Sequence, residues 1–472
     1  MIEFGTGGWR AVIGDGFTRA NVELLAAALA RKLRDEGQKH RGVVIGYDRR
    51  FLSEEAACWA AGALAAAGVP CYVIRRQSPT PLVMFAVRRL ALPCGIAVTA
   101  SHNPAVYNGV KLFTEGGRDA DEQTTQALEG YIRALAAEGG AVPTADYAAA
   151  LADGRIREID PMNDYIDSIL AAVDTDAIRK AGLRIALDPM YGVSKTALQT
   201  ILLTARCDVA VIHERRDTLF GGRLPAPNAK TLAGLMTYVE EHRCDIGLAT
   251  DGDADRLGVI DDRARFLHPN KILVLLYYYL VQYKGWHGAV VRNIATTHLL
   301  DRIAADFGEQ CYEVPVGFKY VSGRMAATGA IIGGESSGGL TVRGHIQGKD
   351  GIYAAALLIE MLAVTDKSLS ALWDEIENRY GRFEMSERDF RFTQEKRAGI
   401  HKTLMEDKLL PDFGRAIRKV SYLDGCKVYF ADGSWIIARF SGTEPLLRIF
   451  CESGDMAQSE QLSAALQDFL GL

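Results

Sequence analysis

The sequence has 472 residues, more than one hydrophobic core usually serves, so we expect three or four domains. Hydrophobic residues make up 48% of the chain and charged residues 24%, close to the globular average, which argues against a disordered or fibrous protein. The net charge of -5 and the pI of about 6.0 lack the basic excess of nucleic-acid binders. We therefore expect no nucleic-acid partner.

Nothing in the sequence indicates a membrane or an oxidising compartment. The eight cysteines are scattered without a C-x-x-C pair, which is typical of reduced thiols in a cytosolic protein. The N-terminal segment, MIEFGTGGWR, has no apolar signal core. The longest apolar run, residues 272–281, is too short to span a bilayer. We expect a soluble, cytoplasmic protein with no membrane partner.

A pattern of buried strands and polar loops occurs three times along the chain. Short β-branched runs, each followed by a helical stretch, lie at residues 43–48, 183–188 and 289–293. Further along each unit, a second buried strand leads into a polar loop: IAVTASHNP (96–104), IGLATDGDADR (246–256) and AIIGGESSGG (330–339). Strands that alternate with helices predict α/β domains with mixed, largely parallel sheets. Ligands of such sheets gather beyond the strand ends, so the three loops predict a shared cleft.

The last hundred residues have a different character. Short strands are predicted at residues 420–423, 427–430 and 435–440, and an amphipathic helix at 459–469. This combination indicates a smaller α+β domain. The predicted division of the chain is 1–152, 153–262, 263–378 and 379–472.

The DGDAD run places three aspartates, Asp251, Asp253 and Asp255, at alternate positions. In an extended segment alternate side chains point the same way, so the carboxylates would converge, which needs a cation. A small set of oxygen ligands favours Mg²⁺, with Ca²⁺ as the competitor. An EF-hand loop needs glycine at its sixth position and glutamate at its twelfth, where this chain has Arg256 and Asp262. The flanks also look like strands rather than helices, which leaves a solvated acidic turn as the other alternative.

The TASHNP loop contains a serine, Ser101, directly after a buried strand. A serine in such a place is a nucleophile if it is activated or repeatedly phosphorylated. The alternative is that Ser101 and Asn103 only cap the turn before Pro104. Lys111, a few residues later, is a candidate proton donor or acceptor, with a lone surface lysine as the alternative.

The two remaining loops offer groups for a sugar and for a phosphate. Residues 333–339 combine flexible glycines with Glu335, Ser336 and Ser337, which suit sugar hydroxyls, although a plain glycine-rich turn has the same composition. Residues 439–448 offer two guanidinium groups, two hydroxyls and backbone amides, which suit a phosphate. The contributing residues are Arg439, Ser441, Gly442, Thr443 and Arg448. An edge strand with a turn at residues 444–445 is the alternative there.

Together the four loops, in this order, resemble the alpha-D-phosphohexomutase family, which includes phosphoglucomutase and phosphomannomutase. The resemblance runs from GTGGWR to RFSGTEP and so covers essentially the whole chain. It implies three α/β domains of one topology and a fourth domain with a TBP-like fold. It also implies that Ser101 is phosphorylated and that Ser101, Asp251, Asp253 and Asp255 bind Mg²⁺.

The same resemblance implies roles for further residues. Four match family active-site positions: Arg10, His102, Lys111 and Arg256. The sugar-selecting loop corresponds to Glu335 and Ser337, and the phosphate-binding loop to Arg439, Ser441, Gly442 and Thr443. Some relatives have asparagine where this chain has Gly442. The segment Gly317-Phe318-Lys319 has lysine where bacterial dual-specificity relatives have histidine, which favours glucose over mannose.

The resemblance implies a reaction that exchanges hexose 1-phosphate and hexose 6-phosphate. Phosphorylated Ser101 gives its phosphoryl group to the free hydroxyl, Lys111 or Lys319 takes the hydroxyl proton, and a hexose 1,6-bisphosphate forms and turns over. Alternatives are a mutase acting on mannose or glucosamine phosphates, a metal-dependent sugar-phosphate phosphatase, or a sugar-phosphate sensor. We expect a sugar phosphate as the only ligand besides Mg²⁺ and the bisphosphate, and a monomer or homodimer.

Overall fold

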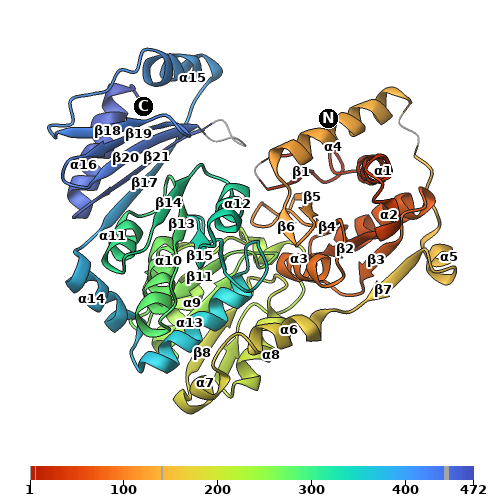
Figure 1. The fold of residues 1–472 in the computed structure, drawn as a ribbon, viewed down its shortest axis with the longest axis horizontal. Helices are drawn as coiled ribbons and strands as arrows, with labels where there is room; N and C mark the ends of the chain where they lie inside the picture. Colours follow the sequence, from red (N-terminus) through yellow and green to blue (C-terminus); the bar gives the residue numbers. More distant parts are fainter. Residues whose placement is uncertain (1, 6, 140–141, 441–445) are drawn as a thin grey trace.

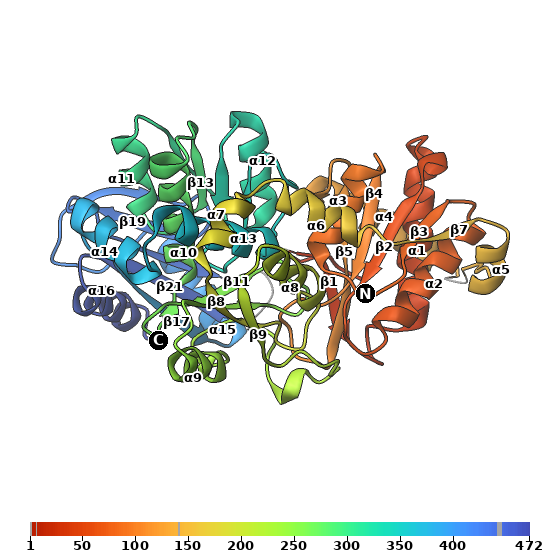
Figure 2. The same ribbon diagram turned by 90° about the horizontal axis from the view of Figure 1, so that it is seen from below.

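The computed structural model describes residues 2–5, 7–139, 142–440 and 446–472. Its strands form four separate sheets, one after another along the chain. In both views the first and fourth units lie at opposite ends of the long axis, with the second and third between them (Figures 1 and 2). The predicted fold class, three α/β units and a C-terminal α+β unit, is confirmed.

The first sheet has the strand order β1-β5-β4-β2-β3-β7, with β6 beside β5. Its strands are β1 (Trp9–Val12), β2 (Val43–Tyr47), β3 (Cys71–Ile74), β4 (Cys94–Val98), β5 (Tyr107–Thr114), β6 (Arg118–Asp119) and β7 (Ile156–Ile159). The helices of this unit are α1 (Arg19–Asp35), α2 (Ser53–Ala66), α3 (Thr80–Arg89), α4 (Glu122–Ala137) and α5 (Tyr147–Ala152). Because β7 pairs with β3, this sheet continues past residue 152, where the sequence analysis placed the boundary.

The second sheet has the order β12-β11-β10-β8-β9 and the third the order β14-β13-β15-β16. The second unit comprises α6 (Met162–Leu170), α7 (Thr175–Ala181), β8 (Arg184–Asp188), α8 (Lys195–Thr204), β9 (Asp208–Val211), α9 (Ala233–His242), β10 (Ile246–Thr250), β11 (Leu257–Ile260) and β12 (Phe266–Leu267). The third comprises α10 (Pro269–Tyr278), β13 (Val290–Asn293), α11 (Leu299–Asp306), β14 (Cys311–Val314), α12 (Phe318–Thr328), β15 (Ile332–Gly334), β16 (Leu340–Val342), α13 (Gly351–Thr365) and α14 (Leu369–Tyr380).

The fourth sheet is antiparallel throughout, in the order β17-β21-β20-β19-β18. Its elements are β17 (Glu384–Arg391), α15 (Gln394–His401), β18 (Ile417–Ser421), β19 (Cys426–Phe430), β20 (Trp435–Phe440), β21 (Leu446–Ser453) and α16 (Met456–Phe469). The helix α16 packs against β17 and β21. Short 3₁₀ and π turns complete the chain at Lys39–Arg41, Phe220–Gly222, Tyr279–Tyr283 and Lys402–Glu406.

The first three sheets share one local motif that positions the polar loops. In each, a strand paired in parallel with its neighbour ends in a loop, and the chain then returns antiparallel beside it. The pairs are β4–β5, β10–β11 and β15–β16. The TASHNP, DGDADR and GGESSGG segments are the three connecting loops, so each stands at the end of a buried parallel strand, as predicted.

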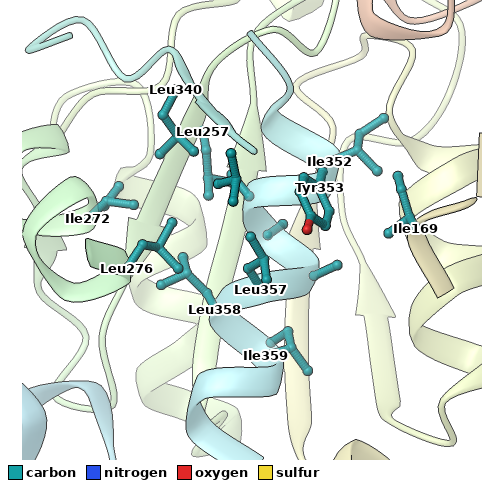
Figure 3. Close-up of a cluster of buried hydrophobic side chains, with 14 of the residues drawn as sticks. Ile169, Leu257, Ile272, Leu276, Leu340, Ile352, Tyr353, Leu357, Leu358 and Ile359 are labelled. Carbon is teal, nitrogen blue, oxygen red and sulfur yellow. The ribbon is translucent and has the colours of Figure 1, made fainter. Parts of the chain in front are cut away.

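The helix α13 joins the second and third units into one core. Apart from Glu360, which pairs with Lys284, it is apolar on all sides, which is typical of a helix with no exposed face, and residues 351–362 are all buried. It contacts α7, α8 and β11 of the second unit as well as α10 and β16 of the third. Figure 3 shows Leu357 and Leu358 of this helix among side chains of α10, β11 and β16. These two units therefore behave as one packed body around α13.

The apolar run at residues 272–281 belongs to α10 and the π turn that follows it. Tyr277, Tyr278 and Tyr279 are buried there, inside the same core. Among the described residues we find no helix with the length and apolar character needed to cross a bilayer.

Truncating a side chain of α13 should destabilise this shared core. Leu357→Ala removes a fully buried side chain and should lower the free energy of unfolding by about 2 to 5 kcal/mol. Leu203→Ala on α8 removes a leucine that is 48% exposed, so a change within about 0.5 kcal/mol is expected. Urea denaturation of both variants measures the difference, and equal effects would show that α13 does not hold the core together.

Candidate active site

One cleft, of about 230 Å³, collects residues from all four units. Among the residues that line it are Arg10, His102, Lys111, Arg256, Lys319, Glu335, Ser337, Lys349, Arg439 and Arg448. The predicted shared cleft is therefore present, and it is strongly cationic. Three of the loops face it directly, and Arg439 and Arg448 bring the strands that flank the fourth loop to the same place.

Ser101 lies at the bottom of the TASHNP loop, buried and in the left-handed region with φ +52°. A non-glycine residue seldom adopts this conformation, which marks a backbone held by its surroundings. Its Oγ donates a 2.6 Å hydrogen bond to Asp251 Oδ2 and lies 3.2 Å from His102 Nδ1. The TASHNP loop and the DGDADR loop thus meet through Ser101 and Asp251.

The conformation of the TASHNP loop is fixed by a buried arginine that the sequence analysis missed. Arg50 is 1% exposed and its guanidinium donates to four backbone carbonyls, those of Ser101 (2.6 Å), Asn103 (2.7 Å), Pro104 (2.9 Å) and Tyr107 (3.0 Å). Asp48 accepts from Thr99 Oγ1 at 2.6 Å, and Thr99 Oγ1 in turn accepts from the Ser101 amide at 2.9 Å. Charged residues immediately after the buried strand β2 were the available signal for this network.

The three aspartates of the second loop converge, but not for the predicted reason. One carboxylate oxygen of each of Asp251, Asp253 and Asp255 lies within 4.8 Å of the others, and all three residues are buried. The segment is a series of turns rather than an extended strand, with Ala254 left-handed at φ +63°. Alternation along an extended chain was therefore the wrong geometry. The loop also touches the first unit, because a Cβ on Gly252 would lie 2.7 Å from the Ser101 carbonyl.

Two lysines balance this acidic cluster. Lys111 Nζ lies 2.6 Å from both Asp253 Oδ2 and Asp255 Oδ2, so it is not the lone surface lysine of the alternative interpretation. Lys349 Nζ, from the loop before α13, lies 2.8 Å from Asp255 Oδ2. The sequence analysis missed Lys349, which directly precedes Asp350 at the start of α13. Each lysine comes from a different unit, so the cluster forms only when the units are assembled.

The protonation of the cluster follows from these contacts. Burial raises the pKa of Asp251 well above its ordinary value, and the nearby Asp253 and Asp255 raise it further. Burial alone would raise the pKa of Asp255, but Lys111 and Lys349 outweigh it and hold that pKa well below the usual range. Burial alone would lower the pKa of Lys111, but Asp253 and Asp255 outweigh it and raise that pKa.

The oxygens left over in the cluster suit a divalent cation. Oδ1 of Asp253 and Oδ1 of Asp255 are buried without a hydrogen-bond partner among the described residues. Buried carboxylate oxygens without a donor are costly unless something positive binds them. With Asp251 and the Ser101 hydroxyl beside them they form an all-oxygen set, which Mg²⁺ prefers. The residues present therefore fit this metal.

Beside the carboxylates, the cleft is lined by two cationic side chains, Arg10 and Arg256, and by His102. The Nε atoms of both arginines are buried and lack hydrogen-bond partners within the described part of the chain. Burial lowers the pKa of Arg10, and the neighbouring Arg256 lowers it further. Arg256, followed by burial, lowers the pKa of His102 well below its ordinary value, so this imidazole is neutral. Arg256 Nε lies 3.9 Å from Asp255 Oδ1, beyond hydrogen-bond distance, so both guanidinium groups keep N–H donors that a phosphate could use.

The GGESSGG loop and the Lys319 segment lie side by side. Glu335 is 8% exposed and accepts from the Gly317 amide at 2.9 Å and from Asn293 Nδ2 at 3.3 Å. Ser337 lines the cleft next to it. Lys319 also lines the cleft, and its Nζ lies 3.3 Å from Glu122 Oε2 on α4.

The fourth unit contributes Arg439 at the end of β20. Its Nε donates to both carboxylate oxygens of Asp424, each at 2.9 Å, and the side chain lines the cleft. Three predicted phosphate ligands, Ser441, Gly442 and Thr443, lie outside the described residues. The structure thus brings Arg439 to the other site residues and leaves the interior of this loop a prediction.

Comparisons with known proteins give the family. Four family models match in chain order: phosphoglucomutase/phosphomannomutase alpha/beta/alpha domain I (residues 1–138), domain II (163–264), domain III (268–380) and the C-terminal domain (401–468). The phosphoglucomutase/phosphomannomutase of Thermococcus kodakarensis is 31% identical over 95% of this chain and 94% of its own length. A probable phosphoglucosamine mutase of Methanothermobacter thermautotrophicus is 30% identical over 95% of this chain and 93% of its own.

A solved structure agrees with these matches. The crystal structure of a phosphomannomutase candidate from Thermus thermophilus superposes with a TM-score of 0.86 at 30% identity, covering 100% of this chain and 99% of that one. The chain belongs to the phosphoglucomutase/phosphomannomutase family, the alpha-D-phosphohexomutases. The family resemblance drawn from the four loops is therefore confirmed.

Removing single carboxylates should separate metal binding from stability. Asp251→Asn removes a carboxyl whose charged form is disfavoured, so the metal-free protein should melt at the same temperature or higher. Asp253→Asn removes one charged partner of the buried Lys111, so the free energy of unfolding should fall by about 1 to 3 kcal/mol.

Both variants should lose Mg²⁺ binding in calorimetry, whereas Asp208→Asn, an exposed aspartate of β9, should keep it. Normal Mg²⁺ binding by either loop variant would contradict the metal site. An early-melting Asp251→Asn protein in EDTA would contradict the charge balance described for the cluster.

Proposed function

We propose that this protein interconverts hexose 1-phosphate and hexose 6-phosphate through a phosphoserine at Ser101 and a hexose 1,6-bisphosphate. The observation that supports it most is the position of the Ser101 hydroxyl, buried 2.6 Å from Asp251 and next in sequence to His102, which lines the cationic cleft. A phosphoryl group on that oxygen would stand between the carboxylate cluster and the arginines. The incoming sugar phosphate would find its own anion sites at Arg10, Arg256 and Arg439.

We propose Mg²⁺ as the resident metal, held by Ser101, Asp251, Asp253 and Asp255. When bound, it would neutralise charge on the transferring phosphoryl group. The residues of the chain do the rest. Lys111, kept protonated by Asp253 and Asp255, would supply positive charge to the carboxylate cluster that Ser101 contacts and would be the proton donor for the Ser101 oxygen.

The reaction also needs a base that takes the proton of the attacking sugar hydroxyl. Lys111 is a poor base in its resting state, because two carboxylates raise its pKa. Lys319 lines the same cleft and, among the described residues, forms an ion pair with the single exposed carboxylate of Glu122, so it is our proposal for this role. Its Glu122 partner lies on α4 of the first unit, so Lys319 is positioned against the unit that carries Ser101.

The bisphosphate must turn end over end between the two transfers, so the second phosphate site must accept either end. A charge-based clamp does this better than a shape-specific pocket. Arg439, together with Ser441, Gly442 and Thr443, is our proposal for that clamp. Glu335 and Ser337 would contact sugar hydroxyls, in whichever orientation the sugar presents them.

Glucose phosphates are our first proposal for the substrate, because Lys319 stands in the phosphoglucomutase pattern Gly-Phe-Lys. Glucosamine and mannose phosphates are the alternatives, and the names of the relatives include enzymes for each of these sugars. Free thiols at all eight cysteines support work in the reducing cytoplasm.

A single assay separates the proposed reaction from its alternatives. Glucose 1-phosphate is supplied with Mg²⁺ and a trace of glucose 1,6-bisphosphate, and the products are identified. Glucose 6-phosphate supports the mutase, inorganic phosphate would indicate a phosphatase, and binding without turnover would indicate a sensor. Repeating it with mannose and glucosamine phosphates ranks the sugars.

Mass spectrometry of the intact protein can detect the proposed phosphoserine. Freshly purified protein should contain a fraction heavier by about 80 Da, with the added group mapped to Ser101. Ser101→Ala should abolish both the heavier species and the mutase reaction, while Ser78→Ala, a buried serine of the same unit, should abolish neither. Phosphate found only on another serine, with an active Ser101→Ala enzyme, would refute the role of Ser101.

A further inference from the structure

Asp424 connects the clamp arginine to the sugar side of the cleft. It lies in the loop between β18 and β19 and does not line the cleft, whereas Arg439 does. Its two oxygens accept from Arg439 Nε at 2.9 Å each, and Oδ2 also accepts from the backbone amide of Val316 at 2.8 Å. One carboxylate of the fourth unit therefore holds both an arginine of its own unit and a backbone group of the third.

The loop that carries Asp424 is built to bring it against Arg439. Gly425 has φ +94°, a conformation that other residues rarely adopt. A Cβ at this position would lie 2.5 Å from the Ala438 carbonyl oxygen and 3.1 Å from Arg439 Cα. Glycine is therefore required for this close approach, which places the neighbouring carboxylate next to the arginine.

In the third unit, the backbone amides of two consecutive residues donate hydrogen bonds to two different carboxylates. The Val316 amide donates to Asp424, and the next amide, that of Gly317, donates to Glu335 Oε1 at 2.9 Å. Glu335 and Lys319 both line the cleft. The start of the segment 316–319 is thus fixed between the fourth unit and the sugar-selecting loop.

We propose that Asp424 is a positioning residue of the phosphate clamp: it aims Arg439 into the cleft and fixes the segment 316–319 at the same time. The inference rests on the proposed function, since it takes Arg439 as a ligand of the substrate phosphate. Asp424 binds only Nε, so both terminal NH₂ groups of Arg439 lie outside this contact. A long side chain fixed at Nε loses less conformational freedom when it binds a phosphate, which favours binding.

If Asp424 and Arg439 formed only a structural ion pair, removing Asp424 would have a different effect on substrate binding. A carboxylate next to a phosphate-binding arginine lowers the local positive charge, so removing it would strengthen anion binding if orientation did not matter. If Asp424 acts mainly by aiming Arg439, its removal weakens binding. Most of that effect disappears once Arg439 is gone, and only the smaller effect of the lost Val316 contact remains. Thermodynamic coupling between the two positions therefore distinguishes positioning from structural support.

The test is a double-mutant cycle in the full chain with Ser101→Ala, which carries no phosphate to transfer. Calorimetry measures the affinity for glucose 6-phosphate. Asp424→Ala should weaken binding about tenfold, and Asp424→Asn about threefold, since asparagine keeps an acceptor for both donors. In the Arg439→Ala background, Asp424→Ala should change affinity by less than about twofold.

The matched control is Asp432→Ala, which removes another aspartate of the fourth unit, paired with Arg415 away from the cleft. It should leave the affinity unchanged. Full additivity of the Asp424 and Arg439 effects, or tighter binding by Asp424→Ala, would overturn the inference. If Asp424→Ala folds poorly, the same comparison is made with Asp424→Asn, with and without Arg439→Ala. If the coupling is found but the enzyme with Ser101 intact shows no mutase turnover, the proposed reaction is wrong and the positioning role of Asp424 stands.

Discussion

Three buried carboxylates on one turn are the constraint on which the rest of the site depends. Asp251, Asp253 and Asp255 could not stay together in a buried site without compensating charge, because like charges at this distance repel strongly. The charges that compensate them come from elsewhere: Lys111 belongs to β5 of the first unit and Lys349 to the loop before α13 of the third. Neutralising the cluster therefore assembles three units around it, and Ser101 is placed against Asp251 as a consequence.

Much of this organisation could be predicted because it depends on short, local segments of the sequence. The strands at residues 43–48, 183–188 and 289–293 are short apolar runs, and burial on both faces of a sheet is their direct physical explanation. The loops that follow the second strand of each unit contain residue types that a packed core does not hold without partners. Ser101, the three aspartates and Glu335 were found in this way. The structure groups Ser101 with the aspartates, and Glu335 lines the cleft together with His102 and Arg256 of the same two loops.

The rest depends on contacts that the local sequence does not record. Lys349 and Arg50 were missed because each finds its partners far along the chain, on Asp255 and on the TASHNP carbonyls. The turn at Ala254 was mistaken for an extended segment, since alanine carries no signal for a left-handed backbone. β7 was placed beyond the first domain because its pairing with β3 arises from tertiary packing.

The central claim is that one serine carries the phosphoryl group between the two ends of a sugar. Its most direct test is a single turnover with protein labelled at Ser101 by radioactive phosphate and mixed with unlabelled glucose 1-phosphate. The account predicts that the label passes into glucose 1,6-bisphosphate and then into glucose 6-phosphate as the reaction proceeds. Label released only as inorganic phosphate, or retained on the protein while product forms, would contradict it.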